Sequence, residues 1–231
     1  MQEKIYTIPV NEAFEQSGDE CPFCFLYKKL EKIELDAISG AAMMEPDIRI
    51  MTNKKGFCVN HYEKMFAYKN RLSLALMLES HIAELAKELK TGGFLSKDIG
   101  SKPAERIEKL EHSCYICEQI DEKFSKMVST AVYLYEKEPE FLKMFNSKKV
   151  ICLPHYKRLL RTANNSMGKK QYELFVKDTD KIISGYISQL SEDVSWFCKK
   201  FDYRYEKEPW NNSKDAVERA IKFLGGPSDI D

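Results

Sequence analysis

Apolar residues recur at helical spacing in two long segments of the chain. In the first segment they occupy one face of a helix, at Leu74, Leu78, Ile82, Leu85 and Leu89. Leu76 and Ala83 widen this face, so we expect a well-buried helix that ends at Gly92-Gly93. The second segment carries a comparable stripe at Phe175, Thr179, Ile182, Ile183, Tyr186, Leu190 and Phe197.

Three more helices are predicted, over residues 24–38, 117–135 and 214–224. Ser213 is the expected N-cap of the last helix, and Gly225-Gly226-Pro227 is its stop signal. The stretch from Gly92 to Pro103 is the expected linker.

Strand signals are few. Tyr6, Ile8 and Val10 occupy alternate positions, and residues 201–205 alternate as well, so either segment is extended chain or a short strand. The pattern as a whole predicts an all-α protein.

Cysteine and histidine form two sets with nearly one period. The sets are Cys21-x2-Cys24 with Cys58-x2-His61, and Cys114-x2-Cys117 with Cys152-x2-His155. The Cys-x2-Cys pairs are related by a shift of 93 (114−21), and the Cys-x2-His pairs by a shift of 94 (152−58). Glu45-Pro46 likewise returns as Glu138-Pro139. The chain therefore contains two repeats, at about 15–92 and 108–191.

We expect two zinc-binding helical domains, residues 1–100 and residues 101–231, the second with a C-terminal extension. Three thiols and one imidazole are the ligand set of a closed tetrahedral zinc site, which leaves no position for a substrate water. Two structural Zn²⁺ ions per chain are predicted, with these ligands: Cys21, Cys24, Cys58, His61, Cys114, Cys117, Cys152 and His155.

Each site is expected to be local to its own repeat. Cys21 and Cys24 would then share an ion with Cys58 and His61. A swapped arrangement, in which they join Cys152 and His155, also satisfies the ligand count and would make the two repeats one inseparable domain.

Other uses of Cys-x2-Cys fit less well. Cys21-Pro22-Phe23-Cys24 resembles a thioredoxin-type motif, but no βαβ pattern surrounds it. Haem attachment would need a histidine where Phe25 and Glu118 stand. An iron–sulfur cluster with one histidine ligand is the less common outcome for this ligand set.

Charge and cysteine content bear on the compartment. Lys plus Arg and Asp plus Glu are 36 each, so no global charge attracts nucleic acid or a membrane. Neither a signal peptide nor a membrane-spanning segment is predicted. Seven cysteines, six of them in Cys-x2-Cys or Cys-x2-His patterns, then favour a reducing, cytoplasmic setting.

A basic segment is the remaining charge feature. Residues 141–172 contain no acidic residue. Its cations would contact nucleic-acid phosphates, with these candidates: Lys148, Lys149, Lys157, Arg158 and Arg161. Alternatively, they solvate the segment and offset a negatively charged zinc centre.

Three other residues have structural interpretations. His81 is interpreted as a hydrogen-bonded, partly buried histidine, and His112 is displaced as a ligand by His155. Cys198 has no place in either ligand set. No phosphate-binding loop or hydrolase motif appears.

Several sequence blocks resemble an uncharacterised bacterial family, a domain of unknown function. They are IPVNEAF (8–14), AAMMEPD (41–47), LALMLESH (74–81), EDVSWF (192–197) and EPWNNSKDA (208–216), together with both Cys/His sets. The resemblance runs nearly end to end. It implies a bacterial, cytoplasmic protein and carries no catalytic residue onto this chain.

We therefore expect a zinc-binding interaction or adaptor protein with protein partners rather than an enzyme. The alternatives are a nucleic-acid-associated regulator that uses residues 141–172, and a thiol or zinc redox sensor or enzyme. Oligomeric state, partner and pathway are not indicated by the sequence.

Overall fold

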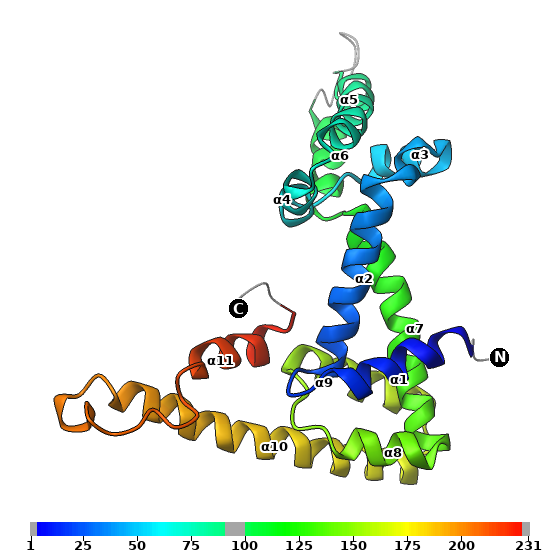
Figure 1. Ribbon diagram of the computed structural model, residues 1–231. Helices are drawn as coiled ribbons and strands as arrows, with labels where there is room; N and C mark the ends of the chain where they lie inside the picture. The colour runs from blue at the N-terminus through cyan, green and yellow to red at the C-terminus, as the bar shows by residue number, and fades with distance from the viewer. Residues whose placement is uncertain (1–3, 91–99, 228–231) are drawn as a thin grey trace. The chain divides into compact units, whose positions relative to one another are not determined.

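The computed structural model describes residues 4–90 and 100–227, and within these ranges the chain is helical. It forms eleven α helices and three short 3-10 helices, without a strand in the described ranges (Figure 1). The all-α prediction is confirmed. The α helices are α1 (Thr7–Gln16), α2 (Pro22–Ser39), α3 (Pro46–Lys55), α4 (Val59–Ala67), α5 (Arg71–Glu88), α6 (Ser101–Glu111), α7 (Tyr115–Lys137), α8 (Pro139–Asn146), α9 (Leu153–Ser166), α10 (Lys169–Lys199) and α11 (Ala216–Gly225).

The chain divides into two compact units. Unit 1 comprises residues 1–28 and 124–231, and unit 2 comprises residues 29–123. Both units contain residues from before and after residue 100, whereas the repeats suggested a domain boundary near that residue. Helices α2 and α7 each contribute to both units.

Unit 1 is built on a cluster of aromatic rings. Phe14 on α1 packs against Phe23 and Phe145, with ring centroids 5.5 and 5.6 Å apart. Phe175 on α10 continues the cluster against Phe145 and Tyr135, at 5.8 and 4.8 Å. All four phenylalanines are fully buried. Burying such rings removes large apolar areas from water, which stabilises the packing of α1, α7, α8 and α10.

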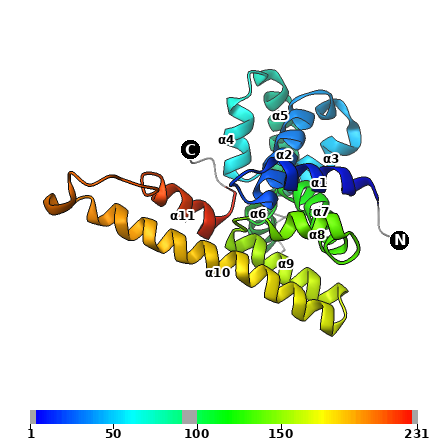
Figure 2. The same cartoon turned by 60° about the horizontal axis from the view of Figure 1, so that its bottom comes forward.

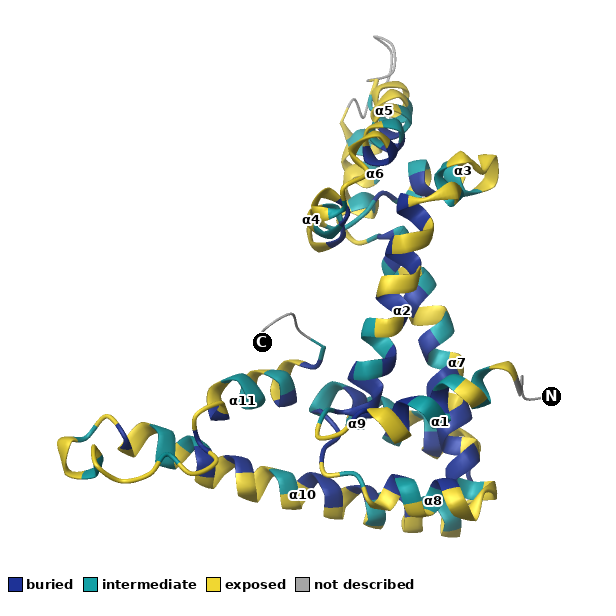
Figure 3. Ribbon diagram, viewed as in Figure 1, coloured by how far each residue is buried: buried dark blue, intermediate teal, exposed yellow. Residues whose placement is uncertain are grey.

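Helix α10 follows its predicted stripe. Phe175, Thr179, Ile182, Ile183 and Leu190 are buried. Tyr186 and Phe197 are half-buried. Figure 3 shows buried and exposed positions alternating along α10, as expected for a helix covered on one side. Helices α9 and α11 pack along α10 (Figure 2).

In unit 2, polar bonds hold α3 against α5. Arg49 donates to the carbonyl of Leu76 at 2.7 Å, and Ser80 donates to the side-chain oxygen of Asn53 at 2.9 Å. The Nδ1–H of His81 donates to the backbone carbonyl of Asn53 at 2.9 Å. Burial lowers the pKa of His81, which favours the neutral ring. His81 is thus the hydrogen-bonded structural histidine that the sequence indicated.

The predicted apolar face of α5 is only partly correct. Its buried residues are Ser73, Leu74, Met77 and His81. Ile82 is 60% exposed and Ala83 is exposed, so the helix is not well buried. Apolar residues occur on most sides of α5 itself. Their periodicity alone therefore does not predict which side of the helix is buried. The bonds to α3 select the face that carries Met77 and His81.

Two segments with strand signals are not strands. Tyr6 belongs to a 3-10 turn, and Ile8 and Val10 lie in α1. Residues 203–205 form a 3-10 turn. A strand needs a partner to satisfy its backbone groups, whereas a helical turn satisfies them locally. Each alternating run is short, and neither pairs as a strand with another segment that the structure describes.

Helix boundaries differ from the predictions in three places. Helix α5 ends at Glu88, before the predicted stop at residues 92–93, which lie outside the described residues. Helix α6 begins at Ser101, so Pro103 lies in its first turn, where proline is tolerated. Ser213 donates to the carbonyl of Trp210 instead of capping α11, which starts after Asp215. Gly226, with φ of 89°, ends that helix as expected.

Candidate metal centres

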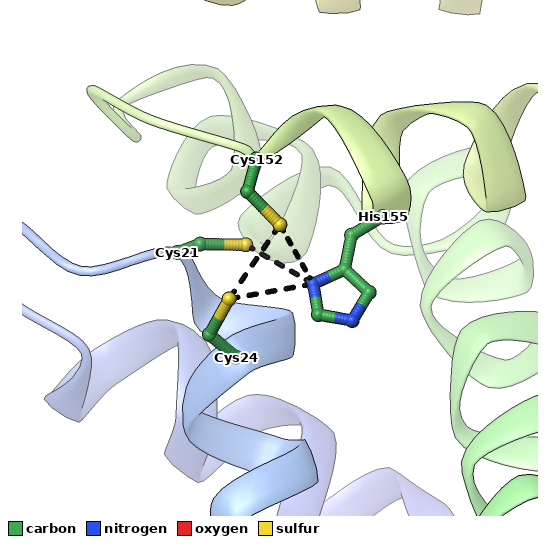
Figure 4. Close-up of side chains that lie close together, drawn as sticks. All are labelled: Cys21, Cys24, Cys152 and His155. Atoms are coloured by element: carbon green, nitrogen blue, oxygen red, sulfur yellow. Dashed lines mark hydrogen bonds between the residues drawn. The ribbon is translucent and has the colours of Figure 1, made fainter. Parts of the chain in front are cut away.

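Four ligand-type side chains converge within unit 1. These are Cys21, Cys24, Cys152 and His155, all buried, and we call them the unit 1 centre. Figure 4 shows the three sulfurs and Nδ1 of His155 turned towards one another. The Nδ1 atom lies 3.6 Å from Cys21 Sγ, 3.5 Å from Cys24 Sγ and 3.1 Å from Cys152 Sγ.

A second set converges within unit 2. Cys58, His61, Cys114 and Cys117 form what we call the unit 2 centre. His61 Nδ1 lies 3.2 Å from both Cys58 Sγ and Cys114 Sγ, and 3.4 Å from Cys117 Sγ. The Cys58 and Cys117 sulfurs are 3.9 Å apart.

These separations have the size of a tetrahedral coordination shell. Sulfur at about 2.3 Å and nitrogen at about 2.05 Å from a tetrahedral zinc ion would lie about 3.8 Å apart for S···S pairs and about 3.6 Å apart for S···N pairs. The S···N distances of 3.1–3.6 Å and the S···S distances of 3.5 and 3.9 Å are close to these values. Either centre could hold one metal ion.

Helix N-termini supply the ligands in both centres. Cys21 directly precedes α2 and Cys24 lies in its first turn, and Cys114 and Cys117 are placed in the same way at α7. Cys152 and Cys58 are the N-cap residues of α9 and α4, with extended ψ values of 155° and 161°. The positive end of a helix dipole favours thiolates at these positions.

Polar loop contacts bring the ligand pairs of unit 2 together. The hydroxyl of Ser113 donates to the carbonyl of Lys55 at 2.7 Å, and the amide of Tyr115 donates to the carbonyl of Gly56 at 3.0 Å. Gly56 has φ of 60°, a conformation that glycine adopts without steric cost. These bonds join the turn before Cys58 to the turn that carries Cys114.

Unit 1 has equivalent loop contacts. Lys149, three residues before Cys152, pairs with Asp19 at 2.8 Å. Lys148 donates to the hydroxyl of Ser17 at 3.3 Å. The turn before Cys152 is therefore joined to the turn before Cys21.

The prediction of local sites is wrong. Cys21 and Cys24 meet Cys152 and His155, and Cys58 and His61 meet Cys114 and Cys117. Each centre therefore joins the Cys-x2-Cys pair of one repeat to the Cys-x2-His pair of the other. The swapped arrangement, first considered as the alternative, is the one observed.

A known protein family matches this chain over its length. The family described as a family of unknown function, DUF6062, matches the chain over residues 1–231. The chain belongs to this family. The resemblance inferred from the sequence blocks is confirmed. No curated protein and no solved structure matches the chain.

In this DUF6062 chain, a carboxylate supports the histidine of the unit 2 centre. Nε2–H of His61 donates to Glu31 at 3.2 Å, and Lys64 donates to the other oxygen of Glu31 at 2.6 Å. Burial would lower the pKa of His61, but the bonds with Cys114 and Glu31 raise it to about 10. This contact orients the ring so that Nδ1 faces the sulfurs, as an outer partner of a metal-bound histidine does. The sequence analysis missed Glu31.

Aromatic rings surround the histidine of the unit 1 centre. Phe124 and Phe23 lie 5.0 and 6.0 Å from His155, measured between ring centroids. Phe124 occupies the repeat position of Glu31 (31+93 = 124). The same position thus supports the histidine of its own repeat in both cases, once by a carboxylate and once by an aromatic ring. A comparison of positions 31 and 124 between the repeats could have pointed to Glu31.

The crowded thiols differ in acidity. The hydrogen bond with Cys117 lowers the pKa of Cys114 to about 3, while the same contact raises the pKa of Cys117. In unit 1, burial would raise the pKa of Cys21, but hydrogen bonds from Cys152 and Cys24 lower it. One thiolate per centre is thus favoured at the expense of its neighbours. A divalent cation would allow all three thiols to ionise together.

The two centres differ in exposure. All four residues of the unit 1 centre are at most 5% exposed. In the unit 2 centre, Cys58 and Cys117 are partly exposed. Reagents in solution can therefore reach the unit 2 centre more easily.

The basic candidates differ in their contacts. Lys148 and Lys149 contact Ser17 and Asp19, as described above. Arg158 donates to the hydroxyl of Ser125 and lies over the Phe124 ring. Lys157 and Arg161 are exposed one turn apart on α9.

The remaining candidates lie outside the two centres. Cys198 is exposed on α10, and His112 is exposed at the end of α6. In residues 4–90 and 100–227, no helix has both the length and the apolar character that crossing a membrane requires.

Proposed function

We propose that this protein is a zinc-binding adaptor, in which two structural zinc ions fasten a helical scaffold that presents apolar side chains to a protein partner. The structural role of zinc in this proposal rests on the closed ligand sets. Three sulfurs and one nitrogen fill a tetrahedral shell, so they suit a structural ion better than a catalytic one. Thiolate ligands need reducing conditions, and we therefore place the protein in the cytoplasm.

Metal analysis tests the zinc half. Protein purified without added metal should contain close to two zinc ions per chain by elemental analysis. Strong visible absorbance with bound iron would favour iron–sulfur clusters instead. Seven free thiols with no metal would contradict both.

Exposed apolar side chains on two helices of unit 2 support the adaptor half. Val59 and Phe66 on α4 and Leu72 and Ile82 on α5 are each more than half exposed. Arg71, the first residue of α5, lies over the ring of Phe66 on α4, 3.5 Å from its centroid. Large apolar side chains that remain exposed to water are candidates for protein contacts.

The adaptor test uses a double variant, Phe66→Ser with Leu72→Ser. A partner that the wild-type chain captures from its native cell should be lost, and purified partner should bind the variant at least tenfold more weakly. Metal content and helicity should be unchanged. Ile8→Ser, at an exposed apolar residue of unit 1, is the control. Equal binding by all three proteins would refute a contact at this surface.

A redox sensor is the second candidate, and the partial exposure of Cys58 and Cys117 favours it. A peroxide would then oxidise these thiols and eject the unit 2 ion. Reversible zinc release by mild peroxide, together with a changed oligomeric state, would support this role. Zinc release without any change of oligomeric state or partner binding would indicate oxidative damage rather than sensing.

Nucleic-acid regulation remains the third hypothesis. It predicts salt-dependent binding to an oligonucleotide that weakens when exposed Lys157 and Arg161 are changed to glutamine.

A further inference from the structure

Unit 1 contains a cavity of about 690 Å³, lined by several charged side chains, that the metal centres do not explain. Its walls come from the turn at residues 146–149, the middle of α10 and the start of α11. Four cationic side chains line it: Lys148, Lys149, Lys181 and Arg219. A volume of this size is typical of small-molecule sites.

Two carboxylates also line the cavity, and each of them pairs with a cation of the same wall. Asp215 is bound by Arg219 at 3.0 Å, and Asp19 is bound by Lys149 at 2.8 Å. Arg219 also binds Asp193 at 3.0 Å, so its charge is largely satisfied. The Lys149–Asp19 pair is exposed on both sides, which makes it weak and easily exchanged.

The other two cations are less well satisfied. Lys181 lies 3.5 Å from Asp178, at the long end of ion-pair distances. Lys148 donates to a neutral oxygen, the hydroxyl of Ser17. Burial lowers the pKa of Lys148, although the charge of Asp19 acts in the opposite direction. An anion in the cavity would gain most from Lys148 and Lys181.

The rest of the wall suits a ligand with more than a charge. The side-chain amides of Asn146, Gln189 and Asn212 offer donors and acceptors, and Tyr186 and Ile182 supply apolar contact. Such a lining fits a molecule with an anionic end and a polar, planar body. A long polyanion fits less well, because Asp19 and Asp215 stand among the cations.

This cavity adjoins the unit 1 centre. A second cavity of about 430 Å³ shares Tyr186 and Arg219 with the first and is lined by the cysteines of that centre, Cys21, Cys24 and Cys152. Asp19 and Lys149 precede Cys21 and Cys152 by two and three residues. A ligand held by the turn at 148–149 and by α10 would therefore restrain a segment that carries a metal ligand.

We propose that the larger cavity binds the phosphate group of a small phosphorylated molecule of nucleotide size, and that this ligand slows metal loss from the unit 1 centre. Lys148 and Lys181 bind the phosphate as point charges, and the amides contact the remainder of the molecule.

Calorimetry on the metal-loaded full chain tests the binding. Adenosine monophosphate and inorganic phosphate are the anionic probes, and adenosine is the uncharged control. We expect the phosphate-bearing probes to bind and adenosine not to bind. Tighter binding of the monophosphate than of phosphate would assign the site to a nucleotide-like molecule, and equal binding would assign it to free phosphate. No binding of either anion would overturn the proposal.

Variants locate the site. Lys181→Gln changes an exposed side chain and should weaken binding about tenfold, as should Lys148→Gln. The matched control, Lys157→Gln with Arg161→Gln, removes two exposed cations of α9 outside the cavity. Equal weakening in the control would overturn the cavity assignment and indicate a general polyanion surface.

Chelator-driven metal release tests the coupling. Saturating monophosphate should slow release in Cys58→Ser, which retains only the unit 1 centre, by several fold. It should leave release from Cys24→Ser, which retains only the unit 2 centre, unchanged. Binding without any such difference would refute the coupling. Calorimetry measures binding of the ligand directly. The ligand proposal can therefore fail or succeed independently of the proposed adaptor function.

Discussion

Single residues decide how each histidine is held. Glu31 accepts from Nε2–H of His61 and is itself held by Lys64, whereas His155 is enclosed by Phe124 and Phe23. A hydrogen-bonded carboxylate fixes the ring tautomer and increases ligand basicity, while packed rings mainly fix the orientation. The two centres should therefore depend on different kinds of neighbour.

Glu31→Leu should weaken metal binding at the unit 2 centre by about 10–100-fold, the usual effect of losing such a partner. The unit 1 centre should keep its affinity. Chelator competition in the Cys24→Ser background, which leaves only the unit 2 centre, measures this directly. Glu34→Leu is the control on the same helix, because Glu34 pairs with Lys123 rather than with His61. An equal loss in both variants would show that Glu31 acts only through the helix.

Thiol exposure predicts an order of reaction. In the metal-loaded protein, Cys198 is exposed and lies outside both centres, so a thiol reagent should modify it first. The partly exposed Cys58 and Cys117 should follow, and the buried unit 1 thiols should react last. Timed mass spectrometry of the modified peptides gives the order. Cys198→Ser should abolish the fastest phase and retain both metal ions. If it instead lost an ion, the ligand assignment would fail.

At the scale of elements, the end of α10 depends on a buried lysine. Lys200 donates to the carbonyls of Tyr205, Glu206 and Glu208 at 2.7, 2.8 and 2.6 Å. Its ammonium lies over the Trp210 ring at 5.3 Å, and Trp196 donates to the carbonyl of Pro209 at 2.9 Å. One cation thus satisfies three carbonyls of a loop that has little regular structure.

Lys200→Met should loosen residues 200–212 while leaving both metal centres intact. Three charge-assisted hydrogen bonds disappear, and we expect a local loss of about 3 kcal/mol. The chain has two tryptophans: Trp196 contacts this loop through Tyr205, and Trp210 lies in the loop and packs against Phe197, so their fluorescence should shift to the red. Lys199→Met changes an exposed neighbour and should leave the spectrum unchanged. An unshifted spectrum in Lys200→Met would show that the loop holds without the lysine.

At the scale of the molecule, the two repeats exchange halves of their metal sites. Each centre takes its Cys-x2-Cys pair and its Cys-x2-His pair from different repeats. An ion bound at either centre would therefore close the chain between residues far apart in sequence, which would remove more unfolded-state entropy than a local site. Neither repeat contains a complete site by the observed pairing.

Double variants distinguish the observed pairing from local pairing. Cys24→Ser with Cys152→Ser changes one centre twice, so one zinc ion should remain. Cys24→Ser with Cys58→Ser changes both centres, so none should remain. Elemental analysis after gel filtration gives the stoichiometry, and each single variant should retain one ion. Local pairing predicts the opposite result for the two double variants.

The sequence by itself determined the features that depend on neighbouring residues. Helical periodicity gave the stripe of α10, because residues three and four apart share a helix face whatever surrounds the helix. The spacing of the Cys and His pairs identified all eight residues of the two centres, since residues i and i+3 at a helix N-terminus can face one ion.

Only the tertiary structure decided which pairs meet. Cys21 and His155 are separated by 134 residues and His61 and Cys114 by 53, and loop bonds such as that between Ser113 and Lys55 bring them together. The same is true of the buried face of α5 and of Glu31 beside His61. These features rest on contacts between segments distant in the chain, and a local pattern of residue types carries no information about which distant segment completes it.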